Sequence, residues 1–313
     1  MKGEKVQTIL GANGQIAIEL ARELHHRGTD EIRLVSRHPR AVNPTDELVS
    51  ADLLDPARTA AAVQGSDVVY FTAGLPADTA LWERQFPTML RSALDATRAA
   101  GAGFVYFDNT YMYPQDARIQ TEKTPFAPVG PKGRVRARMA EMVLEEMDRG
   151  DIPVLIARAP EFYGPGRTQS FTNTLVIDRM AAGKRALVPV RDDRRRTLIW
   201  TPDASRALAL LGNTQDAFGQ TWHLPTPEEH PTYREFVALA ADAFGRTAGH
   251  TVVPRWALSA AGAFSPAARE IRELLPRYAH DNLFDSTKFR TRFPAFAVTD
   301  HRTGLEIIHA AER

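Results

Sequence analysis

Runs of hydrophobic residues alternate with helical patterns along the first half of the chain. Val6–Leu10 is a short, continuous apolar run, which is typical of a buried strand. Ile16, Leu20 and Leu24 then recur at every fourth position, as one face of a helix does. The same reading predicts strands at 32–35, 67–71, 103–107 and 153–157, and helices at 84–100 and 135–147.

Regular alternation of strands and helices predicts a parallel sheet with helices on both faces. The expected fold class is α/β, a Rossmann-type doubly wound sheet with a smaller, discontinuous C-terminal substrate domain. We expect residues 1–160 plus about 191–217 to form the dinucleotide-binding domain. About 161–190 and 218–313 would form the smaller domain, with a helix at 233–244, while 198–200 would return as a strand to the main sheet.

Composition narrows the function classes. The chain has 313 residues and a formal net charge of +1, so no basic footprint predicts nucleic acid as a partner. It has no cysteine, which excludes disulfides, thiolate catalysis and Cys-ligated metals. No apolar run approaches the roughly 20 residues of a membrane span. With no leader expected from the sequence, a cytoplasmic location and no membrane partner are the expectations.

A glycine loop between the first strand and the first helix predicts a phosphate cradle. Gly11 permits a tight turn, Gly14 lets the backbone approach a pyrophosphate at the helix N-terminus, and Ala17 is small enough for helix and strand to pack. The strand before and the helix after supply the context that the motif requires. The loop residues expected to bind the cofactor are Gly11, Asn13, Gly14, Gln15 and Ile16.

The residues after the second strand favour NADP(H), although NAD(H) stays open. An NAD site expects an acidic residue here for the ribose 2′-hydroxyl, whereas an NADP site uses arginine for the 2′-phosphate. Arg37 stands at this place, supported by Ser36 and Arg40. The alternative is a solvated arginine in an arginine-rich chain.

Taken together, the motifs resemble the extended short-chain dehydrogenase/reductases, the NAD-dependent epimerase/dehydratase superfamily. The segments that carry the resemblance are 51–55, 72–74, 158–166 and 196–203. The resemblance implies further cofactor contacts from Asp52, Leu53, Thr72, Ala73, Gly74 and Pro160. It also implies substrate contacts from Phe162 and from Arg196, which matches an arginine that holds a substrate diphosphate in the family.

The chain departs from the family at the catalytic centre, so it resembles an atypical member. The family uses a serine, a tyrosine and a lysine, and the matching positions here are Asn109, Lys132 and Arg136. Asn109 can donate a hydrogen bond to a carbonyl oxygen, and Arg136 could still bind ribose hydroxyls. Lys132 could act as the general acid, aided by a nearby cation, or it could be an exposed loop lysine with the chemistry lost.

Two tyrosines just beyond the fifth strand are further candidates. Tyr111 or Tyr113 could supply a displaced phenol, although tyrosines in such a turn are more often packing residues. The charge run at 191–196 is interpreted as a solvated turn with mixed signs, apart from Arg196. No histidine spacing suggests a metal site.

These patterns support an NADP(H)-binding oxidoreductase of the epimerase/dehydratase type with an Asn-Lys-Arg centre. Its substrate would be a small molecule, a nucleotide sugar or a carbonyl compound, and a homodimer is compatible with the resemblance. The alternative is an NADP(H)-binding sensor or regulator without turnover. A partner-binding relic is disfavoured by the intact glycine loop and by Arg37.

Overall fold

The first strand and helix form where the hydrophobic pattern predicts them. In the computed structural model, which describes residues 5–29, 31–166, 168–265, 269–270 and 272–311, β1 is Val6–Leu10 and α1 is Gln15–His26. Ile16, Leu20 and Leu24 are all buried along one face of α1. The fourfold spacing therefore produces the packed face of this helix.

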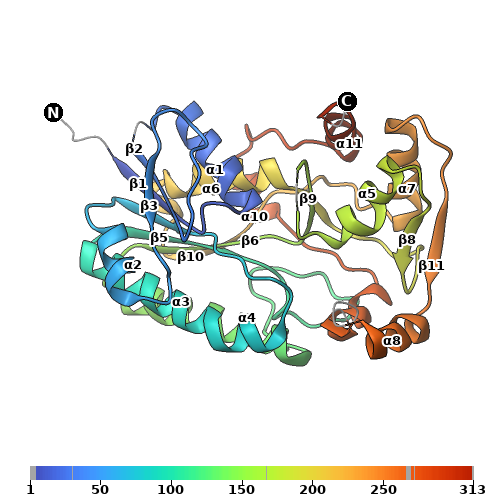
Figure 1. The fold of residues 1–313 in the computed structure, drawn as a ribbon, viewed down its shortest axis with the longest axis horizontal. Helices are drawn as coiled ribbons and strands as arrows, with labels where there is room; N and C mark the ends of the chain where they lie inside the picture. The colour runs from blue at the N-terminus through green and yellow to red at the C-terminus, as the bar shows by residue number, and fades with distance from the viewer. Residues whose placement is uncertain (1–4, 30, 167, 266–268, 271, 312–313) are drawn as a thin grey trace. The chain divides into compact units, whose positions relative to one another are not determined.

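A seven-stranded parallel sheet forms the centre of the first compact unit. Its strand order is β3-β2-β1-β4-β5-β6-β10 (Figure 1). The chain winds outward from β1 in one direction and then in the other, so the topological switch point lies between β1 and β4. The other strands are β2 Glu31–Ser36, β3 Glu47–Ser50, β4 Val68–Phe71, β5 Gly103–Asp108, β6 Val154–Arg158 and β10 Gln220–His223.

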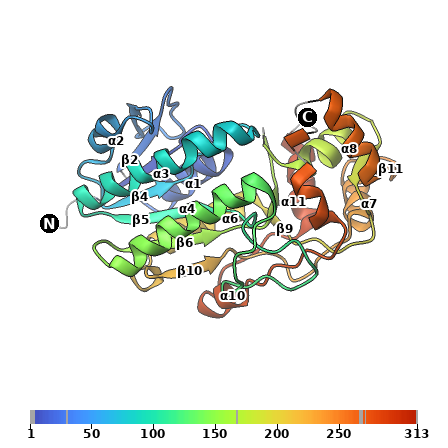
Figure 2. The ribbon, with the colours of Figure 1, turned by 90° about the horizontal axis from the view of Figure 1, so that it is seen from below.

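Helices cover both faces of this sheet, as predicted. Helices α1 and α6 lie on one face, while α2, α3 and α4 lie on the other (Figure 1), and the view from below brings α3 and α4 to the front (Figure 2). The Ser205 hydroxyl of α6 donates to the Ile16 carbonyl of α1 at 3.0 Å, which ties the first pair together. The bounds are α2 Pro56–Val63, α3 Thr79–Ala100, α4 Gly130–Arg149 and α6 Thr201–Gly212.

A second compact unit has its own core and two small parallel sheets. Strand β7 pairs with β9, and β8 pairs with β11. Tyr163, Trp200, Phe236 and Leu305 belong to the buried apolar cluster that holds the unit together. Its elements are β7 Glu161–Tyr163, η1 Asn173–Ile177, α5 Asp178–Ala181, β8 Ala186–Pro189, β9 Leu198–Trp200, α7 Tyr233–Ala243, β11 His250–Val253, α8 Arg255–Phe264, η3 Arg272–Tyr278, α10 Thr287–Arg292 and α11 His301–Ala311.

The α/β fold class is confirmed, but one strand was placed in the wrong sheet. Residues 198–200 do form a strand, β9, yet it pairs with β7 and not with the main sheet. The seventh strand of the main sheet is β10, which pairs with β6. Three-residue strands such as β9 carry too few side chains for a pattern to specify their partner.

The chain crosses between the two units more often than the sequence predicts. The first unit contains 1–108, 134–158 and 204–224, and the second contains 109–133, 159–203 and 225–313. The loop 109–133 and the strand β10 therefore belong to different units from those expected. The second unit is also about as large as the first.

Candidate active site

The glycine loop of the first unit is built around a backbone shape that only glycine adopts easily. Gly11 has a φ of +93°, and a Cβ added to it would lie 2.5 Å from the Cα of Ala73. The N–H groups of Gly11 and Ala12 both donate to the Val35 carbonyl, at 2.9 and 3.1 Å. Gly11 is therefore required by the fold itself, where the ends of β1, β2 and β4 meet.

Gly14 is under a different constraint, because a Cβ in the space beside it would meet its neighbours at ordinary van der Waals distance. It is the N-cap of α1, and a Cβ there would come no nearer than 3.4 Å to the Gly11 carbonyl oxygen. No acidic residue occupies the first turn of α1, so its exposed N–H groups present positive partial charge to this space. An open, glycine-lined helix N-terminus fits the pyrophosphate of a dinucleotide.

Two of the other predicted cofactor residues, Asn13 and Thr72, tie the same loop to the segments around it. The Asn13 amide donates to the His38 carbonyl at 2.7 Å, which fixes the loop against the segment after β2. The Thr72 hydroxyl donates to the Leu10 carbonyl at 3.0 Å, and the Asp52 carboxylate accepts the Leu54 N–H at 3.0 Å. Ile16 and Leu53 are buried, Gln15 and Ala73 are half-buried, and Gly74 is exposed.

Two polar groups stand at the end of β2 without protein partners. Arg37 is exposed and has no ion-pair or hydrogen-bond partner for its side chain among the residues that the structure describes. The Ser36 hydroxyl is buried and likewise has no hydrogen-bond partner there. A phosphate group would supply acceptors to both, since buried hydroxyls normally have a partner.

Arg136 is held in a buried ion pair. It lies on α4, and its Nη2 donates to Asp108 at 2.8 Å. The Arg158 Nε donates to the other oxygen of the same carboxylate at 3.1 Å. Asp108 is fully buried at the end of β5, so two cations share one anion there. Whether Arg136 also binds ribose stays a prediction, but its guanidinium is positioned by Asp108.

Lys132 is also held by carboxylates, and it is not an exposed loop lysine. Its side chain is only 2% exposed, and its ammonium pairs with Glu270 and with Glu273, the latter at 3.0 Å. The sequence predicts that a nearby cation helps Lys132 to give up its proton. The two carboxylates beside Lys132 act against that effect, because they stabilise its positive charge. A group whose protons are donated to two carboxylates is poorly placed to deliver one to a substrate.

Asn109 and Tyr111 line a pocket of the second unit. The Asn109 Oδ1 accepts the Tyr111 N–H at 2.9 Å, which directs the turn and leaves the amide NH₂ as its donor. By contrast, the Tyr113 hydroxyl is buried and donates to the Thr121 carbonyl at 3.0 Å. Pro160 and Phe162 line the same pocket.

Arg196 lies behind this pocket and does not line it. Its Nη2 donates to the Glu161 carboxylate at 2.7 Å, and its side chain is 2% exposed. Arg277, by contrast, does line the pocket, and its Cζ lies 5.2 Å from the centre of the Tyr111 ring. The sequence reasoning missed Glu161 and Arg277. Glu161 lies within the segment 158–166, which carries the family resemblance, whereas no motif surrounds Arg277 in the sequence.

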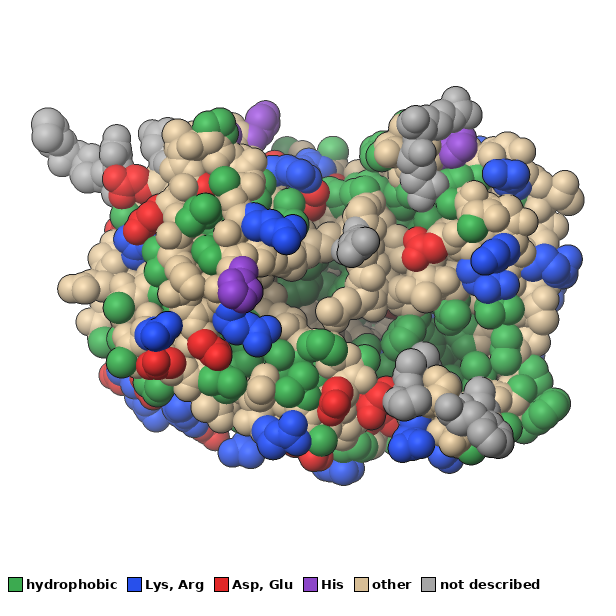
Figure 3. All heavy atoms as spheres, viewed as in Figure 1, with side chains coloured by type: hydrophobic (Ala, Val, Ile, Leu, Met, Phe, Trp, Pro, Cys, Tyr) green, Lys and Arg blue, Asp and Glu red, His purple; other side chains and the backbone are tan. Residues whose placement is uncertain are grey.

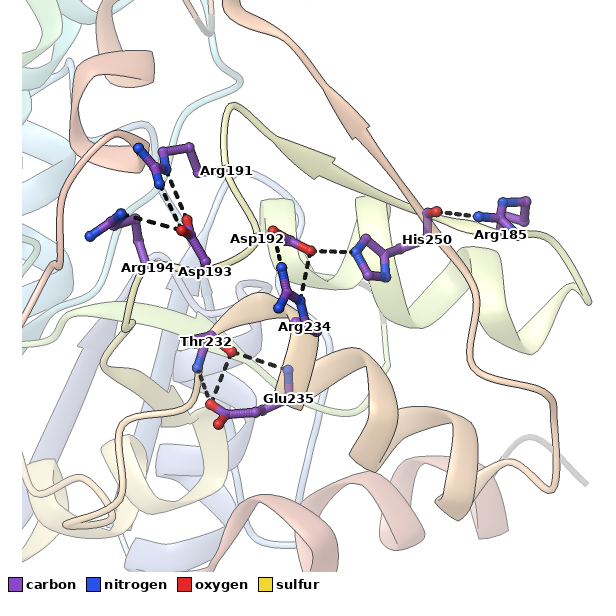
Figure 4. Close-up of polar contacts among 9 residues, drawn as sticks. All are labelled: Arg185, Arg191, Asp192, Asp193, Arg194, Thr232, Arg234, Glu235 and His250. Carbon is purple, nitrogen blue, oxygen red and sulfur yellow. Dashed lines mark hydrogen bonds and ion pairs between the residues drawn. The ribbon is translucent and has the colours of Figure 1, made fainter.

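The rest of the charge run is a solvated turn, as predicted. Arg191 and Arg194 both pair with Asp193, while Asp192 pairs with Arg234 and with His250 (Figure 4). On the face shown in Figure 3, basic side chains lie among acidic and apolar ones. Among the described residues, no helix is long and apolar enough to cross a membrane, and no cluster of His, Asp and Glu could hold a metal ion.

Comparison with known proteins agrees with this geometry. The family model "NAD dependent epimerase/dehydratase family" matches residues 8–223. A curated relative, the ceramide reductase of Caulobacter vibrioides, is 28% identical over 214 residues, which cover 67% of this chain and 61% of the relative. The chain thus matches less than two thirds of that relative's length.

Solved structures share the whole fold at low sequence identity. The crystal structure of gox2253 has a TM-score of 0.80 at 19% identity and covers 98% of both chains. The UDP-glucuronic acid 4-epimerase from Bacillus cereus, solved with NAD, has a TM-score of 0.77 at 16% identity over 97% of both chains. With its parallel sheet, its glycine loop and this match over most of its length, the chain belongs to the NAD-dependent epimerase/dehydratase family.

Proposed function

We propose that this protein is an NADP(H)-dependent oxidoreductase that interconverts a carbonyl compound and its alcohol. The observation that carries the proposal is the loop after β1, in which Gly11 is needed for folding while Gly14 keeps the space at the α1 N-terminus open. The UDP-glucuronic acid 4-epimerase from Bacillus cereus and the UDP-glucose 4-epimerase from Thermus thermophilus, which share this fold, were solved with NAD, which supports a dinucleotide at this place. The preference for NADP(H) rests on the Arg37 side chain and the Ser36 hydroxyl, for which the described residues supply no partner.

Tyr111 is the group we propose as proton donor. It lines the pocket together with Asn109, whereas the Lys132 ammonium is bound to two carboxylates and the Tyr113 hydroxyl to a carbonyl. The Asn109 amide would donate a hydrogen bond to the substrate oxygen, and the Tyr111 phenol would supply its proton. The Arg277 guanidinium beside the Tyr111 ring would offset the negative charge left on the phenol oxygen.

Bound NADP(H) would supply or accept the hydride at its nicotinamide. The protein itself would hold the substrate oxygen and move one proton to or from it. The glycine loop would hold the dinucleotide in place. Arg136 would remain a positioning residue, because Asp108 and the rings of Phe86 and Tyr106 surround its guanidinium.

Substitution of the three candidate acids tests the assignment. Tyr111→Phe should lower kcat by about 10²–10⁴-fold without changing the NADPH Kd, since only the proton donor is lost. Tyr113→Phe and Lys132→Gln should change kcat by no more than a few-fold in protein that remains folded. A robust rate in Tyr111→Phe together with a collapsed rate in folded Lys132→Gln would reverse the assignment.

A sensor without turnover is the second candidate. The observation that favours it is that both Lys132 and Arg136, at the family's tyrosine and lysine positions, are bound by carboxylates. This candidate predicts tight NADPH binding and no oxidation of NADPH with any aldehyde, ketone or nucleotide sugar in a broad panel. Steady consumption of NADPH with one substrate would exclude it.

A further inference from the structure

The pocket of the second unit is mostly apolar, and few charged side chains line it. It encloses about 470 Å³, including its open mouth. Phe162, Phe171 and Leu274 supply apolar walls, and Glu161 and Arg277 are the charged side chains among the described residues that line it. The chemistry of its ligand therefore depends on how these two charges are already used within the protein.

Glu161 has no capacity left for a ligand. One carboxylate oxygen accepts hydrogen bonds from Tyr233 at 2.7 Å and Thr172 at 2.8 Å, and the other accepts from Arg196 at 2.7 Å. Burial raises the pKa of Glu161, but the adjacent Arg196 charge and these hydrogen bonds outweigh it, so the pKa lies below its ordinary value. Glu161 is thus a bound anion within the wall of the pocket.

Arg196 is paired within the protein, although its Nε has no hydrogen-bond partner among the described residues. Besides Glu161, it donates through Nη1 to the Arg277 carbonyl at 2.6 Å, and its Cζ lies 4.4 Å from the centre of the Tyr278 ring. Because Glu161 neutralises it and it does not line the pocket, Arg196 is unavailable to a ligand's phosphate groups. A diphosphate in this pocket would bring its negative charge near Glu161, which lines the wall.

Arg277, the cation that lines this pocket, pairs with no carboxylate among the described residues. It is 8% exposed, and its Nη2 donates to the Thr110 hydroxyl at 3.0 Å. Its Nε has no hydrogen-bond partner, and no carboxylate of the described chain pairs with it. Burial lowers the pKa of Arg277, as expected for a guanidinium without a counter-ion. Buried cations are normally paired, so this one lacks the partner that a ligand could supply.

We propose that this pocket binds a carbonyl compound carrying one anionic group, which pairs with Arg277, and that it does not bind nucleoside diphosphate sugars. A single carboxylate matches one unpaired guanidinium on otherwise apolar walls, whereas a diphosphate would bring further charge against Glu161. The inference rests on the proposed function, in that the pocket beside Tyr111 is taken as the substrate site. This property would distinguish the chain from structural relatives that were solved in complex with UDP-glucuronic acid.

Calorimetric titration of the NADPH-loaded full chain tests the inference without requiring turnover. The probes are levulinate, its uncharged methyl ester, and UDP-glucose. We expect levulinate to bind about 10-fold or more tighter than the ester, the effect of one charge-assisted contact, and UDP-glucose not to bind measurably. UDP-glucose binding tighter than levulinate, or equal affinities for acid and ester, would overturn it. Loss of NADPH binding would instead count against the proposed function, and levulinate can then be titrated into the chain alone.

Variants locate the anion site. Arg277→Gln should weaken levulinate about 10- to 100-fold and leave the methyl ester unchanged, and Arg277→Lys should restore part of the difference. Arg191→Gln is the matched control, because Arg191 is exposed and pairs with Asp193 on the surface (Figure 4). Glu161→Gln should gain affinity for UDP-glucose, since one negative charge is removed from the pocket wall. Unchanged levulinate binding in Arg277→Gln contradicts the inference, and the wild-type ranking of the probes decides it if a variant fails to fold.

Discussion

At the scale of the residue, two glycines of one loop have different roles: Gly11 is needed for folding, and Gly14 is proposed to be needed for cofactor binding. A side chain at Gly11 meets the Ala73 backbone and an unfavourable φ, whereas a Cβ at Gly14 would make ordinary van der Waals contacts with the Gly11 and Thr72 carbonyl oxygens. We expect Gly14→Val to melt near the wild-type temperature and to lose NADPH binding, because the β-branched side chain fills the place of the pyrophosphate. Circular dichroism and NADPH fluorescence measure the two properties.

The companion variant makes this a matched pair. Gly11→Ala should lower the free energy of unfolding by about 1–3 kcal/mol, because alanine is strained at this φ and its Cβ collides with backbone. A Gly14→Val protein that binds NADPH normally would show that the cradle has been misplaced. A Gly11→Ala protein as stable as wild type would show that the turn is not constrained as described.

The proposed preference for NADP(H) is tested at Arg37, at the same scale. Arg37→Ala should weaken NADPH binding by about 10- to 100-fold and leave NADH binding unchanged, because only NADPH carries the 2′-phosphate. Arg58→Ala, which removes an exposed arginine of α2, is the control and should affect neither cofactor. Equal losses for NADPH and NADH would mean that Arg37 acts on the fold or on the shared part of the dinucleotide.

At the scale of the element, Asp108 joins β5, β6 and α4 through two arginines. Removing its charge takes from the buried Arg136 and Arg158 the carboxylate with which each of them pairs. Asp108→Asn should therefore cost about 3–5 kcal/mol of unfolding free energy, the range for breaking buried ion pairs. Urea denaturation measures this change.

A surface pair provides the comparison. Asp95→Asn breaks the Asp95–Arg98 pair on α3, where the aspartate is 54% exposed, so its cost should stay within about 0–1 kcal/mol. Similar costs for the two substitutions would contradict the view that burial makes the Asp108 cluster important.

Long, periodic elements were predictable from sequence, whereas pairings between distant segments were not. The pattern of α1 and the apolar runs of β1 and β5 located these elements because each carries its own burial signal. The four-residue strand β3 and the partner of β9 were not predicted, because a short strand has too few residues to show a hydrophobic pattern. The glycine loop was found because its chemistry is local, but the glutamates beside Lys132 lie about 140 positions later and no local pattern connects them.

At the scale of the whole molecule, a buried histidine makes the second unit sensitive to acid. The His301 ring accepts or donates a hydrogen bond with the Tyr163 hydroxyl at 3.1 Å, and burial lowers the pKa of His301 to about 4. The unfolded chain would take up a proton at His301 near its ordinary pKa, about 6.5, well before the folded chain does. The neutral ring thus stabilises the fold above about pH 6.5, and this contribution is lost as the pH falls towards 4.

The expected loss is about 2–3 kcal/mol of unfolding free energy between pH 7 and pH 4, measured by urea denaturation across that interval. His301→Gln should show a shallower decline with acid than wild type. His26→Gln, on the exposed end of α1, should follow the wild-type curve. Parallel curves for wild type and His301→Gln would remove His301 as the source of the acid sensitivity.

The proposed function depends on the binding of NADP(H) by the glycine loop together with Arg37. Fluorescence titration of the wild-type chain with NADPH and with NADH, at one ionic strength, tests it most directly. We predict saturable binding of both, with NADPH about 10- to 100-fold tighter because of the charge-assisted contact to its 2′-phosphate. Equal affinities, tighter NADH, or no saturable binding of either would contradict the account.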